Sequence, residues 1–368
     1  MNDFLNNQKT IGIVGKGPDA DHFISQANAL GYKTYQLWQE DLEISSEADE
    51  LFIGLLSEEK IQREFVMKTD LLIYFNPSID LEALEIAEKS LIIPQGEDLL
   101  AISQDRSLQK AFYESLGVNL APYELIVKKD DIVNAMSSIG YPAVLRRNVI
   151  QKEASLDSYF IYDEKDIEGA SELLQYGPAV LESWIVADHY LAVTAIKESN
   201  GDIHLYPIVK KHYKNERLAE IKLFETKNVE LVAEIKKVTK LIIDELSFVG
   251  LISLNFILSP AEALYLGDLY PYPNHLSRYT EANPQYSSLQ FYLRALDSLP
   301  LAKINPEEID FSYQPVYADE IASIRQLLLN NPEAQIYLYP ELKNQSFAKD
   351  AEIGYLIREN KQKNSDVE

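Results

Sequence analysis

The 368-residue sequence contains no cysteine. Disulfide bonds, thiol nucleophiles and cysteine-ligated zinc are therefore excluded, so any chemistry has to use oxygen, imidazole or cationic groups. Long apolar runs are also missing, since none approaches the ~18 residues that a membrane-spanning helix needs. The opening residues MNDFLNNQKT lack the basic and apolar parts of a signal peptide. We therefore expect a cytoplasmic protein that does not enter membranes.

Positive charge is scarce. Lys and Arg number 34 against 58 Asp and Glu, which gives a formal net charge of −24. Such a surface repels nucleic acid and anionic membranes, so an anionic ligand would need a local basic pocket. The sequence offers the run KKHYKNER at 210–217 and the group Arg146, Arg147 and Lys152. Each is a candidate site, although a solvated charged face would explain either one.

The order of predicted elements indicates mixed α/β and α+β architecture. The chain is too long for one core, so we expect two or three domains. In the first hundred residues, predicted strands at 10–15, 32–38, 70–75 and 90–95 alternate with predicted helices at 19–30, 57–69 and 81–89. This alternation is typical of a parallel sheet flanked by helices.

The glycines after the first strand resemble a dinucleotide-binding fingerprint. Gly15 and Gly17 precede a helix, with Ala20 at the third glycine position. However, Asp19 and Asp21 place negative charge where a pyrophosphate would lie, and they can cap the helix and complement its dipole themselves. A Rossmann oxidoreductase stays open as an alternative, but nothing downstream resembles a catalytic domain for hydride transfer.

The rest of the chain predicts a different arrangement. We expect one helix over 99–117, followed by a compact α+β unit up to about residue 186. The turn at 200–202 joins two antiparallel strands at 189–199 and 202–210. An amphipathic helix at 229–246 precedes a second antiparallel pair at 251–259 and 263–270. Beyond residue 301 we expect one clear strand, QIYLYP at 335–340, and a disordered tail from 358.

Several strings follow one another along the chain: GIVGKG, QDRSLQKAFYESLGVNLAPYELI at 104–126, GYPAVLRR, VGLISLNFIL, GDLYPYPNHLSRYTEA and SLQFYLRALDSLPL. In this order they resemble the ATP-grasp superfamily and, within it, the carboxyaminoimidazole ribonucleotide synthetases of purine biosynthesis. The resemblance implies a Rossmann-like domain at 1–98, an ATP-grasp domain at 99–300 with a flexible lid subdomain at about 120–185, and a small C-terminal β-containing domain at 301–368. It also implies a homodimer that binds small-molecule nucleotide ligands, with ATP and Mg²⁺ as cofactors.

The metal positions implied by the resemblance have changed. The family supplies two glutamates from the last two strands of the core, whereas this chain has Asn255 and Asp268. Magnesium prefers hard oxygen ligands in octahedral geometry. One negative charge is therefore gone and the remaining carboxylate is one methylene shorter, which predicts a weakened Mg²⁺ site.

The implied ATP site is also altered. Arg146 replaces the family's nucleotide-binding lysine, and no glycine occurs between Gly140 and Gly169, where the family has a glycine-rich phosphate lid. Glu182 keeps the acidic hinge position, and the backbone at Ser183 to Ile185 could read adenine. Tyr190 stands where the family has a ribose-binding glutamate. A tyrosine cannot accept from two hydroxyls as a carboxylate does. Arg106 is the second implied phosphate contact.

The substrate end departs further from the family. His275, Arg278 and Lys349 are the cations that could rebuild a contact to the ribonucleotide phosphate, although such residues are often simply polar surface groups. Two functions follow from the resemblance. One is a divergent ATP-dependent carboxyaminoimidazole ribonucleotide synthetase, which joins bicarbonate to aminoimidazole ribonucleotide. The other is a catalytically inactive ATP-grasp paralogue that acts as a nucleotide sensor or partner subunit. Well-kept core segments beside altered polar site residues are the pattern expected when folding is selected and catalysis is not, and both functions stay open.

Overall fold

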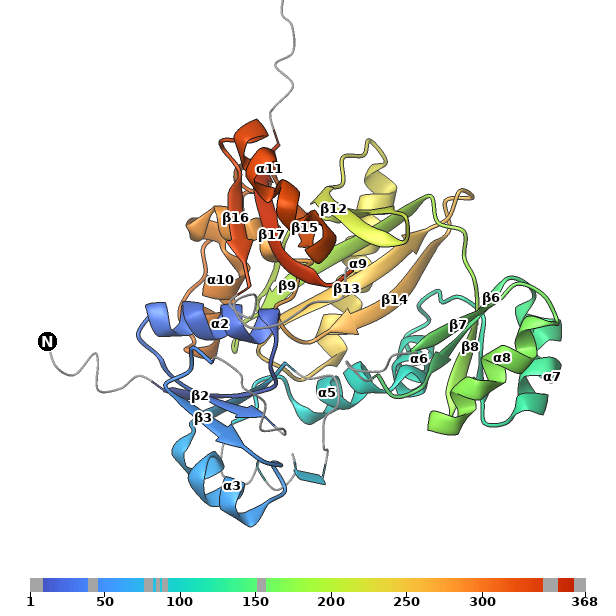
Figure 1. The fold of residues 1–368 in the computed structure, drawn as a ribbon, viewed down its shortest axis with the longest axis horizontal. Coiled ribbons are helices and arrows are strands. Elements are labelled where there is room, and N and C mark those ends of the chain that lie inside the picture. The colour runs from blue at the N-terminus through green and yellow to red at the C-terminus, as the bar shows by residue number, and fades with distance from the viewer. Residues whose placement is uncertain are drawn as a thin grey trace, which may run out of the picture.

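Three sheets organise the chain (Figure 1). The computed structural model describes residues 9–38, 46–75, 82–83, 87, 92–150, 157–339 and 350–360. A four-stranded sheet belongs to the N-terminal segment, a second four-stranded sheet to residues 123–183, and a nine-stranded sheet to the remainder. The mixed α/β and α+β class expected from the sequence is confirmed. In the described part of the chain, no helix combines the length and apolar character needed to cross a membrane.

The N-terminal sheet is parallel, in the order β3-β2-β1-β4. Its strands are β1 (Thr10–Val14), β2 (Lys33–Trp38), β3 (Glu50–Ile53) and β4 (Leu71–Tyr74), with helices α2 (Pro18–Ala29) and α3 (Glu59–Glu64). Of the predicted strand at 90–95, residues 92–95 are described, and within them Ile92 forms a bridge to Leu71. Most of the predicted helix at 81–89 lies outside the described residues.

The start of α2 corrects one expectation. Its N-cap is Gly17 and no side chain caps the helix. Asp19 instead forms an ion pair of 2.6 Å with Arg278, which is 259 residues further along the chain. The acidic group at this helix end is therefore explained by a tertiary contact as well as by the helix dipole.

The single helix predicted over 99–117 is two helices, α5 (Glu97–Gln104) and α6 (Arg106–Ser115). Asp105 between them is extended, and its side chain accepts a hydrogen bond from the Leu108 amide as the N-cap of α6. The Asn148 amide also donates to Asp105 at 2.8 Å. The Asp105 side chain thus accepts one hydrogen bond from α6 and one from Asn148. These bonds begin a new helix at a position that has no proline or glycine.

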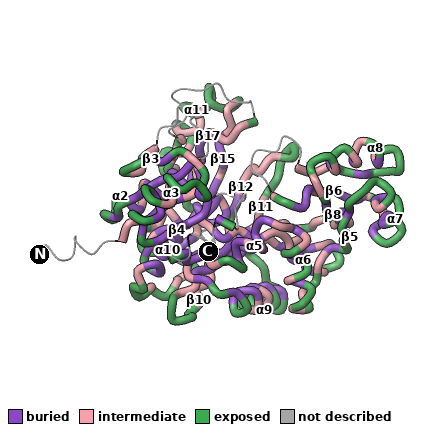
Figure 2. The backbone as a smooth tube through the Cα atoms, turned by 90° about the horizontal axis from the view of Figure 1, so that it is seen from below, coloured by how far each residue is buried: buried purple, intermediate pink, exposed green. Residues whose placement is uncertain are grey.

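We call the second four-stranded sheet the lid sheet. It is antiparallel, in the order β5-β8-β6-β7. Its strands are β5 (Tyr123–Ile126), β6 (Ala143–Arg147), β7 (Ser158–Ile161) and β8 (Ala179–Ser183), with helices α7 (Lys129–Ile139) and α8 (Asp166–Ser171). A separate core, which includes Ile126, Ile132 and Leu181, packs these helices onto the sheet. Figure 2 shows the outer faces of α7 and α8 exposed.

The nine-stranded sheet runs β14-β13-β9-β11-β12-β15-β17-β16, and β10 pairs with β9. Its strands are β9 (His189–Lys197), β10 (Ile203–Leu205), β11 (Val209–Lys214), β12 (Arg217–Leu223), β13 (Gly250–Leu258), β14 (Leu264–Tyr270), β15 (Phe311–Tyr317), β16 (Gln335–Leu338) and β17 (Glu352–Glu359). The strand predicted at 202–210 is therefore split into β10 and β11. The predicted disordered tail begins too early, because Arg358 and Glu359 belong to β17.

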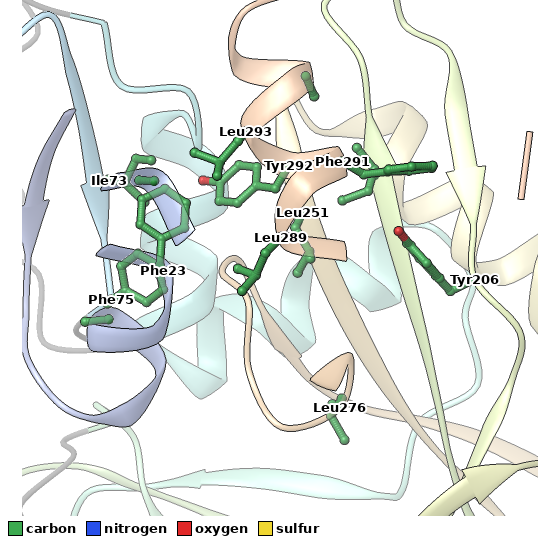
Figure 3. Close-up of a cluster of buried hydrophobic side chains, with 14 of the residues drawn as sticks. Phe23, Ile73, Phe75, Tyr206, Leu251, Leu276, Leu289, Phe291, Tyr292 and Leu293 are labelled. Carbon is green, nitrogen blue, oxygen red and sulfur yellow. The ribbon is translucent and has the colours of Figure 1, made fainter. Parts of the chain in front are cut away.

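Two helices cover opposite faces of this sheet. α9 (Val229–Glu245) contributes Leu231, Ile235 and Ile243 to one core cluster. On the other face, α10 (Ser288–Leu296) joins the nine-stranded sheet to α2, as Figure 3 shows with Phe23, Leu251 and Tyr292. The remaining helices of the described residues are α11 (Ile324–Asn330) and the short 3₁₀ turns Val66–Lys68, Glu172–Tyr176, Arg278–Ala282, Pro284–Tyr286, Pro306–Glu308 and Ala318–Ser323.

Candidate functional site

A β-bulge brings the two predicted metal positions together. Leu254 pairs with Leu269 and Phe256 pairs with Leu266, so Gly267 and Asp268 on β14 both lie opposite Asn255 on β13. Bulges next to functional sites re-aim side chains in this way. Gly267 also lies close to Asn255, since a Cβ atom at this glycine would be 3.5 Å from the Asn255 Cβ. Asn255 and Asp268 are therefore neighbours on one sheet.

Lys211 on β11 contacts Asn255. Asn255 pairs with Ala192 on β9, and Ala192 pairs with Val209 on β11. Lys211 is two residues beyond Val209 and shares its face of the sheet, because side chains alternate along a strand. Its Nζ donates a hydrogen bond of 2.8 Å to Asn255 Oδ1. Burial lowers the pKa of Lys211 to about 8, against an opposing effect of Asp268.

Arg146 of the lid sheet pairs with Asp268 of the nine-stranded sheet. Its two terminal nitrogens donate to the two carboxylate oxygens at 2.9 and 3.3 Å. Burial by itself would raise the pKa of Asp268, but Arg146 and then Arg106 hold this pKa well below its usual value. Asp268 is thus an anion that the lid sheet neutralises with a bidentate arginine.

Glu182 on β8 joins the same network. It accepts a hydrogen bond of 2.8 Å from Lys110 of α6 and lies 3.6 Å from Arg146. Lys110 and Glu182 are each 11% exposed at the side chain, so this ion pair is buried. It connects α6 to the strand that ends at the hinge.

Arg106 lies at the start of α6 and is 4% exposed at the side chain. It forms an ion pair of 2.9 Å with Asp157 and donates at 2.6 Å to the backbone carbonyl of Arg147. Burial lowers the pKa of Arg106, and Arg146 acts in the same direction. The two arginines predicted to bind phosphate therefore lie in one group, in which Arg106, Lys110, Arg146 and Lys211 accompany the carboxylates Asp157, Glu182 and Asp268. We call this group the cleft network.

The contacts of Asn255 and Asp268 do not fit a magnesium site. Mg²⁺ needs oxygen ligands in near-octahedral geometry. Here the Asn255 oxygen accepts from Lys211, and both Asp268 oxygens accept from Arg146. No group of three His, Asp or Glu side chains with metal-binding geometry occurs among the residues that the structure describes. The predicted Mg²⁺ ligands are thus brought together, but each one contacts a resident cation.

The hinge residues lie at the end of β8. The Ser183 amide donates to the Pro122 carbonyl at 2.9 Å, and the Trp184 amide donates to the Pro142 carbonyl at 3.0 Å. Ile185 follows this paired stretch. Tyr190 lies directly opposite Lys211 in the β9–β11 ladder, with its ring 5.3 Å from that of Tyr213. Tyr190 therefore belongs to the same face of the sheet as Lys211 and Asn255.

Two of the residues predicted to bind substrate phosphate, His275 and Arg278, lie after β14 in the chain. Arg278 stacks over Tyr355 at 4.8 Å and pairs with Asp19, so its charge already has a partner. It lines a cavity of about 250 Å³ together with His22 and Tyr339. Burial lowers the pKa of His275 to about 4; Asp19 opposes this effect, and Lys211 and Arg278 act in the same direction as burial. Lys349 lies outside the described residues.

Residues 111–288 match the family model described as the ATP-grasp domain. The fold and this match define a protein with an ATP-grasp domain. Over most of its length the chain is similar to N5-carboxyaminoimidazole ribonucleotide synthases. The one from Bacillus subtilis (strain 168) is 26% identical over 337 residues, which cover 89% of this chain and 86% of that protein.

Solved structures give the same result for the fold. The Staphylococcus aureus N5-carboxyaminoimidazole synthetase in complex with ADP has a TM-score of 0.86 at 20% identity, covering 96% of this chain and 93% of that one. An Aspergillus clavatus N5-carboxyaminoimidazole synthase in complex with ADP and 5-aminoimidazole ribonucleotide has a TM-score of 0.83 at 17% identity, covering 96% and 94%. The resemblance inferred from the sequence strings is confirmed.

Sequence reasoning missed Lys211 and gave no role to Lys110. The basic run at 210–217 was a candidate anion site, but its charge did not indicate which residue would contact Asn255. Alternation on a strand would have separated Lys211 from Lys210. The contact with Asn255 depends on strand pairing across β9, which residue spacing does not reveal.

Proposed function

We propose that this chain is a divergent ATP-dependent ligase of the carboxyaminoimidazole ribonucleotide synthetase type. The proposal is supported by similarity along 89% of the chain to such a synthase and by a fold shared with ADP-bound synthetases. ATP would lie between the lid sheet and the nine-stranded sheet, with its adenine at the hinge of Ser183 to Ile185. The reaction would join bicarbonate to aminoimidazole ribonucleotide at the expense of ATP.

The single observation that carries the nucleotide site is the cleft network. In a chain with a net charge of −24, four cations gather where the two sheets face each other. Phosphoryl transfer depends mainly on positioning and on the neutralisation of phosphate charge. Arg106 and Arg146 would bind the phosphates, and Tyr190 would lie beside the ribose. His275, Arg278 and Lys349 are proposed at the substrate phosphate.

The proposal includes the division into domains at 1–98, 99–300 and 301–368, with the lid at about 120–185. The lid is supported by its own sheet and its own apolar core. The proposal also includes a cytoplasmic location, which was expected from the composition, and a homodimer, which the resemblance implies. Size-exclusion chromatography with light scattering would measure the assembly, and a monomer at all concentrations would contradict it.

A second candidate function is nucleotide binding without ligation. It is favoured by the contacts of Asn255 with Lys211 and of Asp268 with Arg146, which leave the two metal positions bonded to cations. A sensor or a partner subunit needs to bind ATP but not to transfer its phosphate. Removing one charge-assisted contact to a reacting phosphoryl group commonly costs on the order of a hundredfold in rate.

Two measurements test these functions in sequence. ATP should raise the melting temperature, because a ligand at 100 times its dissociation constant adds about 2.7 kcal/mol of stability. ADP formation is then followed with bicarbonate and aminoimidazole ribonucleotide, each omitted in turn. Turnover that requires both substrates supports the ligase, whereas ATP binding without turnover supports the second function. Absence of any ATP effect contradicts both.

A further inference from the structure

The cleft network places two positive charges where the resemblance implies a metal. Lys211 Nζ is 2.8 Å from Asn255 Oδ1, and Arg146 bonds both oxygens of Asp268. Because the bulge sets Asp268 opposite Asn255, the two cations bond neighbouring residues of one sheet. They come from different sheets, Lys211 from β11 and Arg146 from β6.

Both cations are held in place by the fold. Lys211 on β11 reaches Asn255 on β13 across β9, where Ala192 pairs with Asn255, and the Lys211 Nζ lies 6.0 Å from the Tyr213 ring centre. The Arg146 side chain is 24% exposed and is fixed on two sides by Asp268 and Glu182. Fixed charges of this kind need little reorganisation when an anion arrives.

Divalent metals at nucleotide sites neutralise phosphate charge and orient the phosphate oxygens. An ammonium offers three donors and a guanidinium offers five, so both groups can bind phosphate oxygens directly. Asn255 occupies one donor of Lys211. The single carboxylate at the metal positions already pairs with Arg146, so a second cation would have to displace that arginine.

We propose that this cleft binds the phosphates of a nucleotide without a divalent cation, with Lys211 and Arg146 taking the place of the metal. The inference rests on the proposed nucleotide site and specifies how that site neutralises phosphate charge. It applies equally to a ligase and to a non-catalytic nucleotide-binding protein, because it concerns binding alone.

The test is calorimetric titration of the full chain with ATP, once in EDTA and once with Mg²⁺ in excess. We expect affinities that agree within about threefold, since the charges come from the protein. Tighter binding by more than about tenfold in Mg²⁺ would overturn the inference and leave the proposed nucleotide site intact. No binding under either condition would overturn the nucleotide site and the inference together.

Substitution of the lysine provides the second part of the test. Lys211→Met should weaken ATP binding in EDTA by roughly tenfold or more, because a charge-assisted hydrogen bond is lost. Lys210→Met is the matched control, since Lys210 is the neighbouring lysine on the opposite face of β11, and it should bind as the parent does. Equal binding by the two variants would contradict the role of Lys211.

The last part of the test is a variant that should require Mg²⁺ for ATP binding. Lys211→Met combined with Asn255→Glu removes the resident cation and restores a second carboxylate beside Asp268. Its ATP binding should become dependent on Mg²⁺ by about tenfold or more, because carboxylate oxygens are ligands that magnesium prefers. Circular dichroism confirms that the variant is folded before titration. A folded variant whose binding remains strong in EDTA would overturn the assignment of Lys211 as the metal's replacement.

Discussion

Arg146 and Asp268 join the lid sheet to the nine-stranded sheet through a bidentate ion pair across 122 residues of sequence. An anion that binds Arg146 has to share it with this carboxylate. The ion pair therefore links the two sheets and limits the positive charge that Arg146 offers to a ligand. In this arrangement Asp268 competes with a nucleotide for Arg146. In a metal site the same carboxylate would promote nucleotide binding, because it would hold the metal.

The first prediction concerns the charge of Asp268. Asp268→Asn should tighten ATP binding in EDTA by about tenfold, equivalent to ~1.4 kcal/mol, because Arg146 loses its competing anion. Asp268→Glu keeps the charge and should bind within about twofold of the parent. Calorimetric titration measures both. Weaker binding by the asparagine variant would show that Asp268 supports the ligand directly.

The position of this pair could be predicted from the sequence only in part. The similarity strings placed Asn255 and Asp268 on the last two strands, and both lie there. Their cationic partners depend on the meeting of two sheets and on the register across β9. Long-range pairings of this kind leave no local pattern in the sequence. Asn255 and Asp268 were therefore predicted as metal ligands, but their hydrogen bonds with Lys211 and Arg146 were not predicted.

The helical region before the lid shows the same limit. Periodicity predicted one helix over 99–117, because no proline or glycine interrupts it. The break at Asp105 arises from its contact with Asn148, a residue 43 positions further on. Similarly, Pro315 argues against a strand at 311–317, yet β15 forms there by pairing with β17 on one side and meeting β12 at a single pair.

The second prediction concerns the buried pair of Lys110 and Glu182. Lys110→Met should lower the free energy of unfolding by about 3 kcal/mol, because Glu182 loses its closest partner while remaining buried. In Lys110→Met with Glu182→Leu the unpaired charge is gone, so the loss should be smaller than in Lys110→Met alone. Urea denaturation of the parent, both single variants and the double variant measures the coupling. Additive losses would contradict an interaction between these side chains.

The third prediction uses two glycines with similar φ angles. Gly250 has a φ of 123° and Gly177 a φ of 118°. A Cβ atom at Gly250 would lie 2.1 Å from Tyr292 in the core between α10 and β13, whereas a Cβ at Gly177 would meet nothing within 4 Å. Gly177→Ala should therefore lose only the ~1–3 kcal/mol of backbone strain.

Gly250→Ala should lose at least about 2 kcal/mol more, because Tyr292 is fully buried and has to move. Thermal denaturation of the two variants measures the difference. Gly250→Ala with Tyr292→Leu should recover part of the loss if the ring is the obstacle. Equal losses of unfolding free energy in the two variants would show that the Tyr292 ring moves aside without cost.

The last prediction concerns acid stability at the junction of α2 with Arg278. Burial lowers the pKa of His22 to about 3 from 6.5, and Arg278 acts in the same direction, while Asp19 opposes them. Because the folded pKa lies below the unfolded value, the unfolded chain takes up a proton first as the pH falls. The contribution of neutral His22 to the free energy of unfolding is therefore fully present above pH 6.5 and declines as the pH falls from about 6.5 to 3.

Each pH unit in that window should cost up to ~1.4 kcal/mol from this one group. His22→Gln removes the titrating ring, so its unfolding free energy should fall less steeply from pH 7 to pH 5 than that of the parent. His275→Gln is the matched comparison, since burial lowers the pKa of His275 to about 4 as well. Denaturant titrations at both pH values supply the slopes. A parent and a His22→Gln variant with equal slopes would mean that His22 accepts a proton in the folded state, and its ring would then have to contact water or an anion there.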